Sequence, residues 1–258
     1  MTPRYRDAQV GGCIEASIEQ RADGSTVLRS VDPLRWYPER LTDSLEQWAR
    51  EAPDRTFIAR RASVGNDDGG EWITVSYAQM LQRVRSVGQA LVDLGLSAER
   101  PVVILSDNDI EHLTLALASM WAGVPYAPIS SAYSLISQDY AKLRHIVGTV
   151  TPGLVFASGP AYAKAIQAVV ADDVTVVLTE GGIDGRQTRS FASLLETVPV
   201  DSLNQAHANV NADTIAKFLF TSGSTKAPKG VINTHRMLCA NQQMLRQCMG
   251  FLADEPPV

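Results

Sequence analysis

The chain has 258 residues, 45% of them hydrophobic, and its 23 basic and 28 acidic side chains give a formal net charge of −5. A chain of this length buries a sizeable core and forms one or two domains. The acidic balance argues against a broad nucleic-acid-binding face. The longest apolar region, residues 113–124, is shorter than the ~20 residues of a membrane span, and residues 1–12 lack the apolar core of a signal peptide. We therefore expect a cytoplasmic protein without nucleic-acid or membrane partners.

The cysteines and histidines are scattered. The three cysteines are odd in number and show no C-x-x-C spacing, which argues against a disulfide framework or a zinc knuckle. The four histidines, at positions 112, 145, 207 and 235, lack the i, i+4 spacing of a helical metal site. We expect reduced, structural cysteines and no protein-ligated transition metal.

The first elements follow a polar leader over residues 1–40. Thr42 is an expected N-cap of a helix that ends before Pro53. Short strands are predicted over residues 57–60 and 71–75, around a turn rich in Gly, Asn and Asp. Alternation of short strands and helices already begins here.

A longer helix is predicted to begin at a Ser76 cap and to stop at Gly95. Its apolar positions recur at three- and four-residue spacing: Met80, Val84, Val87, Leu91 and Leu94. A buried strand over residues 101–105 follows, and then a helix capped by Asp107 or Asn108. Gly123 leads to the next strand, over residues 124–127.

The same alternation continues downstream and predicts an α/β fold of wound parallel sheets flanked by helices. Helices are expected over residues 139–150 and 161–171, strands over 154–157 and 174–178, and polar connectors over 181–189 and 199–211. Residues 130–135 follow a strand, where open α/β sheets place ligand loops. Tyr133 there either borders a ligand or lies in a turn.

The most informative stretch is FLFTSGSTKAPKGV, residues 218–231. Its apolar start predicts a buried strand, and Gly223 and Gly230 allow an anion to approach the backbone. Lys226 and Lys229 supply positive charge. Four hydroxyls are available to phosphate oxygens: those of Thr221, Ser222, Ser224 and Thr225. The order of these groups favours a nucleotide-phosphate loop over a plain surface loop.

This loop is not a Walker motif, because Pro228 stands where that pattern needs its second glycine. After the loop, His235 and Arg236 either contact an anion or begin a surface helix capped by Thr234. Apolar residues at core spacing are expected on that helix: Met237, Leu238, Met244 and Leu245.

The segment TSGSTKAPKGV resembles the phosphate-binding motif of the adenylate-forming acyl-CoA synthetases, ligases and luciferases, with Lys226 where the family usually has glycine. The resemblance continues through LTDSLEQWAREAPDRTFIARR, VSYAQMLQRVRSVGQAL, AGVPYAPISSAYSL and VINTHRMLCANQQM, and is closest to the feruloyl-CoA synthase branch. It covers roughly Leu41 to the C-terminus.

The resemblance implies an acid–thiol ligase of phenylpropanoid catabolism. A carboxylate such as ferulate and ATP, with Mg²⁺, would give an acyl-adenylate and pyrophosphate, and coenzyme A would then displace AMP. The implied nucleotide-binding residues are Thr221, Ser222, Gly223, Ser224, Thr225, Lys226 and Lys229, with Lys229 also catalytic. The implied domains are a leader over 1–40, a first α/β subdomain over 41–210 and the start of a second over 211–258.

Other parts of the family pattern are not found in this sequence: an aromatic-Gly-x-Thr-Glu segment, a ribose-binding Asp, a hinge and a C-terminal lysine. We therefore expect an N-terminal fragment that is nearly inactive by itself. Two alternatives stay open, namely a non-catalytic nucleotide-binding module and an adenylation domain that loads a carrier protein.

Overall fold

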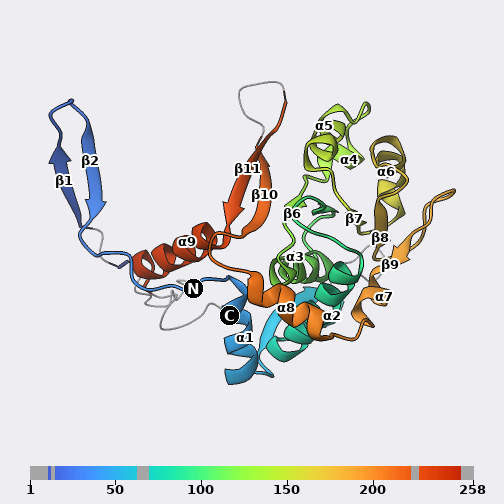
Figure 1. The fold of residues 1–258 in the computed structure, drawn as a ribbon, viewed down its shortest axis with the longest axis horizontal. Coiled ribbons are helices and arrows are strands. Elements are labelled where there is room, and N and C mark those ends of the chain that lie inside the picture. Colours follow the sequence, from blue (N-terminus) through green and yellow to red (C-terminus); the bar gives the residue numbers. More distant parts are fainter. Residues whose placement is uncertain (1–10, 13–14, 63–69, 222–226, 251–258) are drawn as a thin grey trace, which may run out of the picture. The chain divides into compact units, whose positions relative to one another are not determined.

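The computed structural model describes residues 11–12, 15–62, 70–221 and 227–250 (Figure 1). The chain forms two compact units, a larger one over Arg40–His235 and a smaller one from Met1–Glu39 and Arg236–Val258. The predicted subdomains over 41–210 and 211–258 stay a prediction. No described helix is long and apolar enough to cross a membrane.

The larger unit alternates strands and helices along most of its length. Its strands are β3 (Thr56–Arg61), β4 (Trp72–Ser76), β5 (Val102–Leu105), β6 (Tyr126–Pro128), β7 (Leu154–Ala157), β8 (Thr175–Leu178), β9 (Arg189–Ser190), β10 (Ile215–Thr221) and β11 (Lys229–Thr234). Its helices are α1 (Thr42–Glu51), α2 (Tyr77–Asp93), α3 (Ile110–Ala122), α4 (Ala132–Leu135), α5 (Ala141–Val150), the 3-10 helix η1 (Pro160–Tyr162), α6 (Ala163–Val169), α7 (Phe191–Leu195) and α8 (Asp201–Asn209).

One sheet organises this unit, with strand order β11-β10-β6-β5-β7-β8-β9. Neighbouring strands from β10 to β9 pair in parallel, and β11 returns antiparallel to β10. Strands β3 and β4 form a separate antiparallel pair. The predicted α/β fold with a parallel sheet flanked by helices is confirmed.

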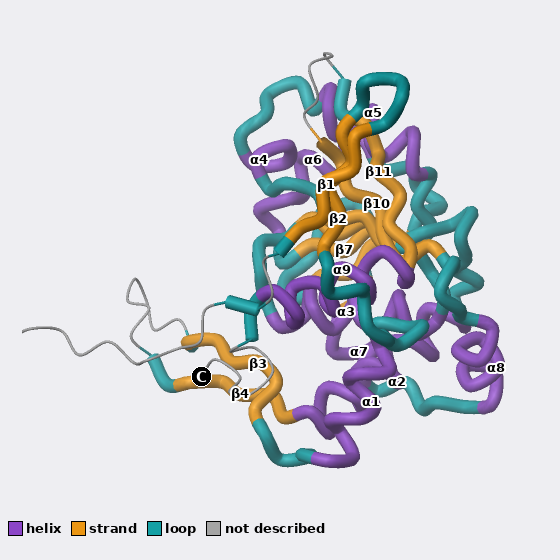
Figure 2. Tube along the Cα trace, turned by 90° about the vertical axis from the view of Figure 1, so that its left-hand side faces the viewer, coloured by secondary structure: helices purple, strands orange, loops and turns teal. Residues whose placement is uncertain are grey.

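Helices cover both faces of the sheet, with α5 and α6 on one side and α2 and α3 on the other (Figure 2). Val103 and Val155 pack with Leu143 of α5 and Ile166 of α6 in one buried cluster. Successive side chains of a strand point to opposite faces, so the buried Phe156 faces the other layer, where its ring meets Phe191 at 5.5 Å between centroids. Burial on both faces explains the continuous apolar runs of the central strands.

The predicted cap of α2 is confirmed as a capping box. Ser76 Oγ accepts a hydrogen bond from the Gln79 amide at 3.3 Å, and Gln79 Oε1 accepts one from the Ser76 amide at 2.9 Å. Both bonds satisfy amides that a helix start leaves unpaired. The predicted stop at Gly95 is also confirmed, since this residue has a positive φ of 65°.

Replacing Ser76 by alanine is expected to lower the free energy of unfolding by about 1 kcal/mol, because the capping acceptor is lost. Urea denaturation measures the change. Gln82→Ala is the matched control, since Gln82 is an exposed residue of the same helix and should change the stability far less. Equal effects of the two substitutions would contradict the capping role.

Two other predicted caps are wrong. Helix α3 is capped by Asp109, which has extended backbone and accepts from the His112 amide, because Asp107 is engaged elsewhere as the acceptor of the Ser131 hydroxyl. Helix α1 is preceded by Leu41, and Thr42 is its buried first residue. A threonine at the right spacing does not cap when its side chain packs inward.

Several elements were not predicted. Residues 199–211, expected to be a polar connector, contain α8, and residues 130–135 contain the short helix α4. Helix α8 has one buried side chain, Leu203, so it lacks the apolar stripe that marks a helix in sequence.

The smaller unit contains a hairpin and a helix. Strands β1 (Ala16–Gln20) and β2 (Thr26–Ser30) pair antiparallel within the expected leader, and all their side chains but that of Val27 are exposed. Helix α9 (His235–Cys248) holds residues 32–35 through Gln247, whose Oε1 accepts from the Arg35 amide at 2.9 Å. Met237, Met244 and Leu245 of α9 are exposed, so the expectation that they form core is wrong.

Candidate phosphate-binding site

The ends of β10 and β11 present two of the predicted site residues. Thr221 closes β10 and Lys229 opens β11, and the two are paired directly across the hairpin. Both are exposed. The predicted residues Ser222, Gly223, Ser224, Thr225 and Lys226 form part of the connection between them and lie outside the described residues.

The hairpin is placed by its apolar strand. Phe218 and Phe220 pack against the cluster under α5 and α6, so the alternation of a strand directs Lys217 and Thr221 to the opposite face. Hydrophobic burial of the two phenylalanines thus fixes which way the last hydroxyl of the strand points. The predicted strand at 218–220 is confirmed as part of β10, but its side chains are only partly buried.

A histidine far away in the sequence supports the second limb of the hairpin. His145 of α5 lies with its Nε2 3.1 Å from the carbonyl oxygen of Pro228, to which it donates a hydrogen bond. Pro228 is buried and directly precedes Lys229. The bond therefore fixes the backbone from which the lysine side chain leaves.

Sequence reasoning also missed Lys217, a half-buried cation within the apolar strand β10. Burial lowers the pKa of its ammonium group below the usual value. Lys217 is in register with Tyr126 of β6, and burial raises the pKa of Tyr126 to about 12. A lysine inside an otherwise apolar run was the signal that would have found this position.

The sequence left two interpretations of His235, an anion contact or the start of a helix. The structure supports the second. His235 begins α9, its side chain is fully buried, and its Nδ1 accepts a hydrogen bond from the Leu41 amide at 3.1 Å. Burial lowers its pKa to about 4. The ring is therefore neutral and engaged by the chain, and the anion interpretation is wrong.

The topology places the end of β10 at the carboxyl edge of the parallel strands. The connection from β5 through α3 leads to β6 on one side, and the connection from β7 through α6 leads to β8 on the other. Open α/β sheets bind ligands outside the carboxyl ends of strands at such a switch point. Because β10 runs parallel to β6, Thr221 lies at this same edge.

Polar groups gather where β5 and β6 end. Ser131 Oγ donates to Asp107 Oδ1 at 2.7 Å, and Ser106 Oγ lies 3.1 Å from His112 Nδ1. The neighbouring Tyr133, offered as a ligand contact or a turn residue, lies in α4 with the Lys142 ammonium 5.3 Å from its ring centre.

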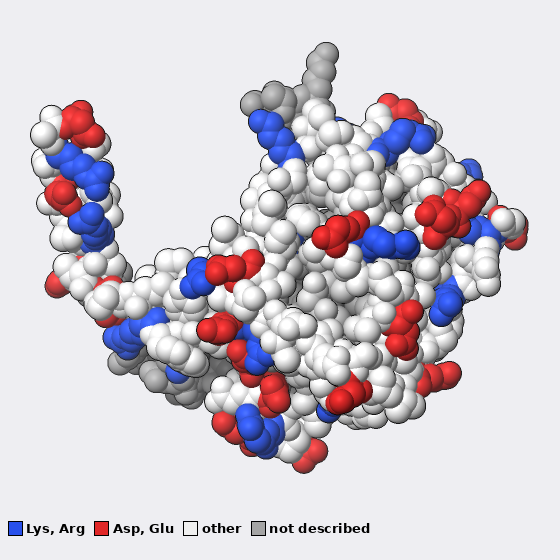
Figure 3. Space-filling view, in the orientation of Figure 1, with Lys and Arg blue, Asp and Glu red and all other residues white. Residues whose placement is uncertain are grey.

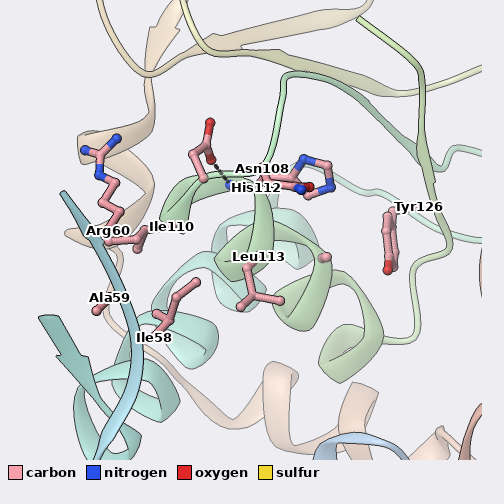
Figure 4. A pocket seen from close by; sticks show the side chains of 10 residues that line it. Ile58, Ala59, Arg60, Asn108, Ile110, His112, Leu113 and Tyr126 are labelled. Atoms are coloured by element: carbon pink, nitrogen blue, oxygen red, sulfur yellow. Dashed lines mark hydrogen bonds between the residues drawn. The ribbon is translucent and has the colours of Figure 1, made fainter. Parts of the chain in front are cut away.

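A cavity of about 410 Å³ lies between β3, the start of α3 and β6 (Figure 4). Arg60, Asn108 and His112 give it polar groups, and Ile58 and Leu113 are among its apolar ones. The pKa of Asp109, which also lines it, is raised, mainly by burial. Its lining includes no residue of the β10–β11 hairpin, so it is a separate feature.

Charges of both signs are interspersed on the face drawn in Figure 3. Arginine and lysine side chains there alternate with aspartate and glutamate over the helices and loops.

The parallel sheet with helices on both faces, and with Thr221 and Lys229 in register at the end of β10, defines an α/β protein. The family model described as AMP-binding enzyme matches residues 45–255. The chain belongs to the AMP-binding enzyme family, whose members form adenylates, and the predicted family membership is confirmed.

Known relatives match with modest identity. The chain is 27% identical over 223 residues to luciferin 4-monooxygenase of Nipponoluciola cruciata, covering 80% of this chain and 37% of the relative. It is 25% identical over 211 residues to fatty acyl-CoA synthetase B of Dictyostelium discoideum, covering 77% and 30%. The chain thus spans about a third of the length of these relatives.

Solved structures confirm the fold. The crystal structure of a fatty acyl-adenylate ligase from L. pneumophila, in complex with acyl adenylate and pyrophosphate, matches with a TM-score of 0.55 and 20% identity. The match covers 78% of this chain and 31% of that one. It corresponds to the N-terminal part of such enzymes.

Proposed function

We propose that this chain is the N-terminal part of an ATP-dependent carboxylate–CoA ligase, which forms an acyl-adenylate and then an acyl-CoA. The observation that carries the proposal is the pairing of Thr221 with Lys229 at the carboxyl edge of the sheet. Membership of the AMP-binding family supports it, as does the similarity to a fatty acyl-CoA synthetase.

Lys229 is proposed to stabilise negative charge on the departing pyrophosphate. An exposed ammonium group on a strand end suits this role, because its three donors reach phosphate oxygens without a costly rearrangement of the backbone. The hydroxyl of Thr221 is proposed to donate a hydrogen bond to the same phosphates. The bond from His145 to Pro228, at 3.1 Å, positions the lysine backbone without touching the nucleotide.

The remaining loop residues are proposed to complete the phosphate contacts: Ser222, Gly223, Ser224, Thr225 and Lys226. Mg²⁺ would accompany ATP and neutralise part of its charge. The hydroxyl of Thr221 and the ammonium of Lys229 fit the anionic phosphates rather than the metal ion, so we assign no residue of this chain to Mg²⁺. Coenzyme A is the proposed thiol substrate.

The proposed acid is ferulate or a related hydroxycinnamate, which rests on the resemblance of residues 41–258 to that branch. The polypeptide expressed from the native locus is incubated with ATP, Mg²⁺ and CoA, and with ferulate, benzoate or palmitate in separate reactions. Mass spectrometry of the CoA thioesters identifies the accepted acid. Feruloyl-CoA as the main product supports the proposal. A preference for palmitate would contradict ferulate as the substrate and indicate a fatty acid instead.

The same reactions separate the other candidate functions. An acyl-adenylate that accumulates with CoA present, and is consumed only by a phosphopantetheine-bearing carrier protein, would indicate an adenylation domain. ATP binding without any adenylate would indicate a nucleotide-binding module. Formation of a CoA thioester excludes both.

A further inference from the structure

Three metal-ligand side chains meet between α1 and α8, away from the phosphate hairpin. Asp43 and Glu46 are three residues apart on α1 and so share one helix face, and His207 lies on α8. One ligand atom of each side chain lies within 4.8 Å of those of the other two. All three belong to the larger compact unit.

The histidine is held in a metal-binding orientation. Its Nδ1 donates a hydrogen bond to the carbonyl oxygen of Trp121 at 3.1 Å, and its ring stacks on the Trp121 indole with 3.9 Å between centroids and 6° between planes. The proton therefore resides on Nδ1, which leaves a lone pair on Nε2. Metal-ligating histidines use this arrangement, with the second nitrogen bonded to a carbonyl.

The free nitrogen lacks a partner within the part of the chain that the structure describes. His207 Nε2 is a buried atom with no hydrogen-bond partner there. A buried acceptor without a donor or a cation costs free energy. When the ring is neutral, ionised carboxylates cannot donate to this nitrogen, whereas a cation bound between them would satisfy both.

The cluster keeps one negative charge that is not balanced by an ion pair among the described residues. Arg40 Nε donates to Asp43 Oδ1 at 2.7 Å and Arg40 Nη1 to the carbonyl oxygen of His207 at 3.3 Å. Arg40 thus neutralises one carboxylate. Glu46 is exposed and forms no ion pair among the described residues. Both Asp43 oxygens accept from Arg40, Oδ1 from its Nε and Oδ2 from its backbone amide, and each oxygen has a further lone pair for a metal ion.

We propose that Asp43, Glu46 and His207 bind one divalent transition-metal ion such as Zn²⁺. One imidazole nitrogen with two carboxylate oxygens is a donor set that suits zinc, with water in the remaining position. The ion would link α1 to α8, in addition to the hydrogen bond from Arg40 to the carbonyl oxygen of His207. The site is independent of the proposed ligase activity, because it shares no residue with the phosphate hairpin.

Zinc binding is measured by isothermal titration calorimetry on the 258-residue chain without nucleotide. Cys13→Ser and Cys248→Ser are introduced together as the background, because free thiols also bind zinc. We expect one equivalent of Zn²⁺ to bind. Glu46→Gln should weaken the binding at least tenfold, and Glu51→Gln, on an exposed glutamate of the same helix, should leave it unchanged.

Loss of the histidine ligand is tested separately. His207→Gln should abolish the binding, but it also removes the ring stacked on Trp121, so circular dichroism must show a folded chain. Zn²⁺ should raise the melting temperature of the background chain and of Glu51→Gln, and that of Glu46→Gln much less. Absence of saturable binding, or equal affinity of Glu46→Gln and Glu51→Gln, would overturn the site.

Discussion

Replacing Lys229 by alanine is expected to lower the rate of carboxylate-dependent ATP–pyrophosphate exchange by about 10²- to 10³-fold. The lysine supplies a fixed positive charge where negative charge grows on the leaving pyrophosphate, so its loss acts on the transition state more than on ATP binding. Exchange of labelled pyrophosphate, measured on the polypeptide expressed from the native locus, gives the rate directly.

The control is Lys164→Ala, which removes an exposed lysine from α6. Both lysines are exposed, so neither substitution should change the melting temperature appreciably. If Lys229→Ala exchanged pyrophosphate at the rate of Lys164→Ala, Lys229 would have no part in adenylation. A raised KM for ATP with an unchanged kcat would limit the lysine to nucleotide binding.

Local sequence signals predicted those parts of the fold that local interactions determine. Strand β7 occupies the predicted residues 154–157. A short, continuous apolar run of this kind is typical of a strand that helices cover on both faces. The Ser76 cap was equally local, since its partner Gln79 lies three residues away. Helix α8 was missed because little of its surface is buried, so its residues carry no apolar period.

The candidate site likewise contains residues that a local motif predicts and residues that only long-range contacts bring together. Thr221 and Lys229 were predicted from a continuous motif, and the structure pairs them across β10 and β11, while their role stays a prediction. His145 was not predicted, because its contact with Pro228 joins residues 83 positions apart. The cluster of Asp43, Glu46 and His207 was not predicted, because its histidine comes from a different helix than its carboxylates and leaves no spacing signal in the sequence.

Acidification is expected to destabilise the larger unit through His235. Burial, the largest cause, lowers the pKa of this histidine to about 4, against an ordinary value of 6.5. The charges of Arg40 and His207 also lower it, and Asp43 opposes them. A protonated ring would also lose the Nδ1 lone pair that accepts from the Leu41 amide.

The direction in which folding stability changes with pH follows from proton binding at His235. Between pH 6.5 and about 4 the unfolded chain binds a proton at His235 that the folded chain does not, so folding stability rises with pH in this window. The contribution is fully present above pH 6.5, and about 3 kcal/mol of it is lost as the pH falls to 4. Other groups titrate in the same range, so the effect of His235 must be isolated by substitution.

His235→Asn provides this isolation, because asparagine offers an oxygen to the Leu41 amide and does not titrate. Urea denaturation from pH 4 to 8 should show a shallower loss of stability at low pH for His235→Asn than for the unaltered chain, whatever its stability at pH 8. His145→Asn, which removes a histidine with an exposed side chain, should follow the unaltered chain. Parallel curves for the unaltered chain, His235→Asn and His145→Asn would show that His235 keeps an ordinary pKa. The ring would then become exposed to solvent before it is protonated.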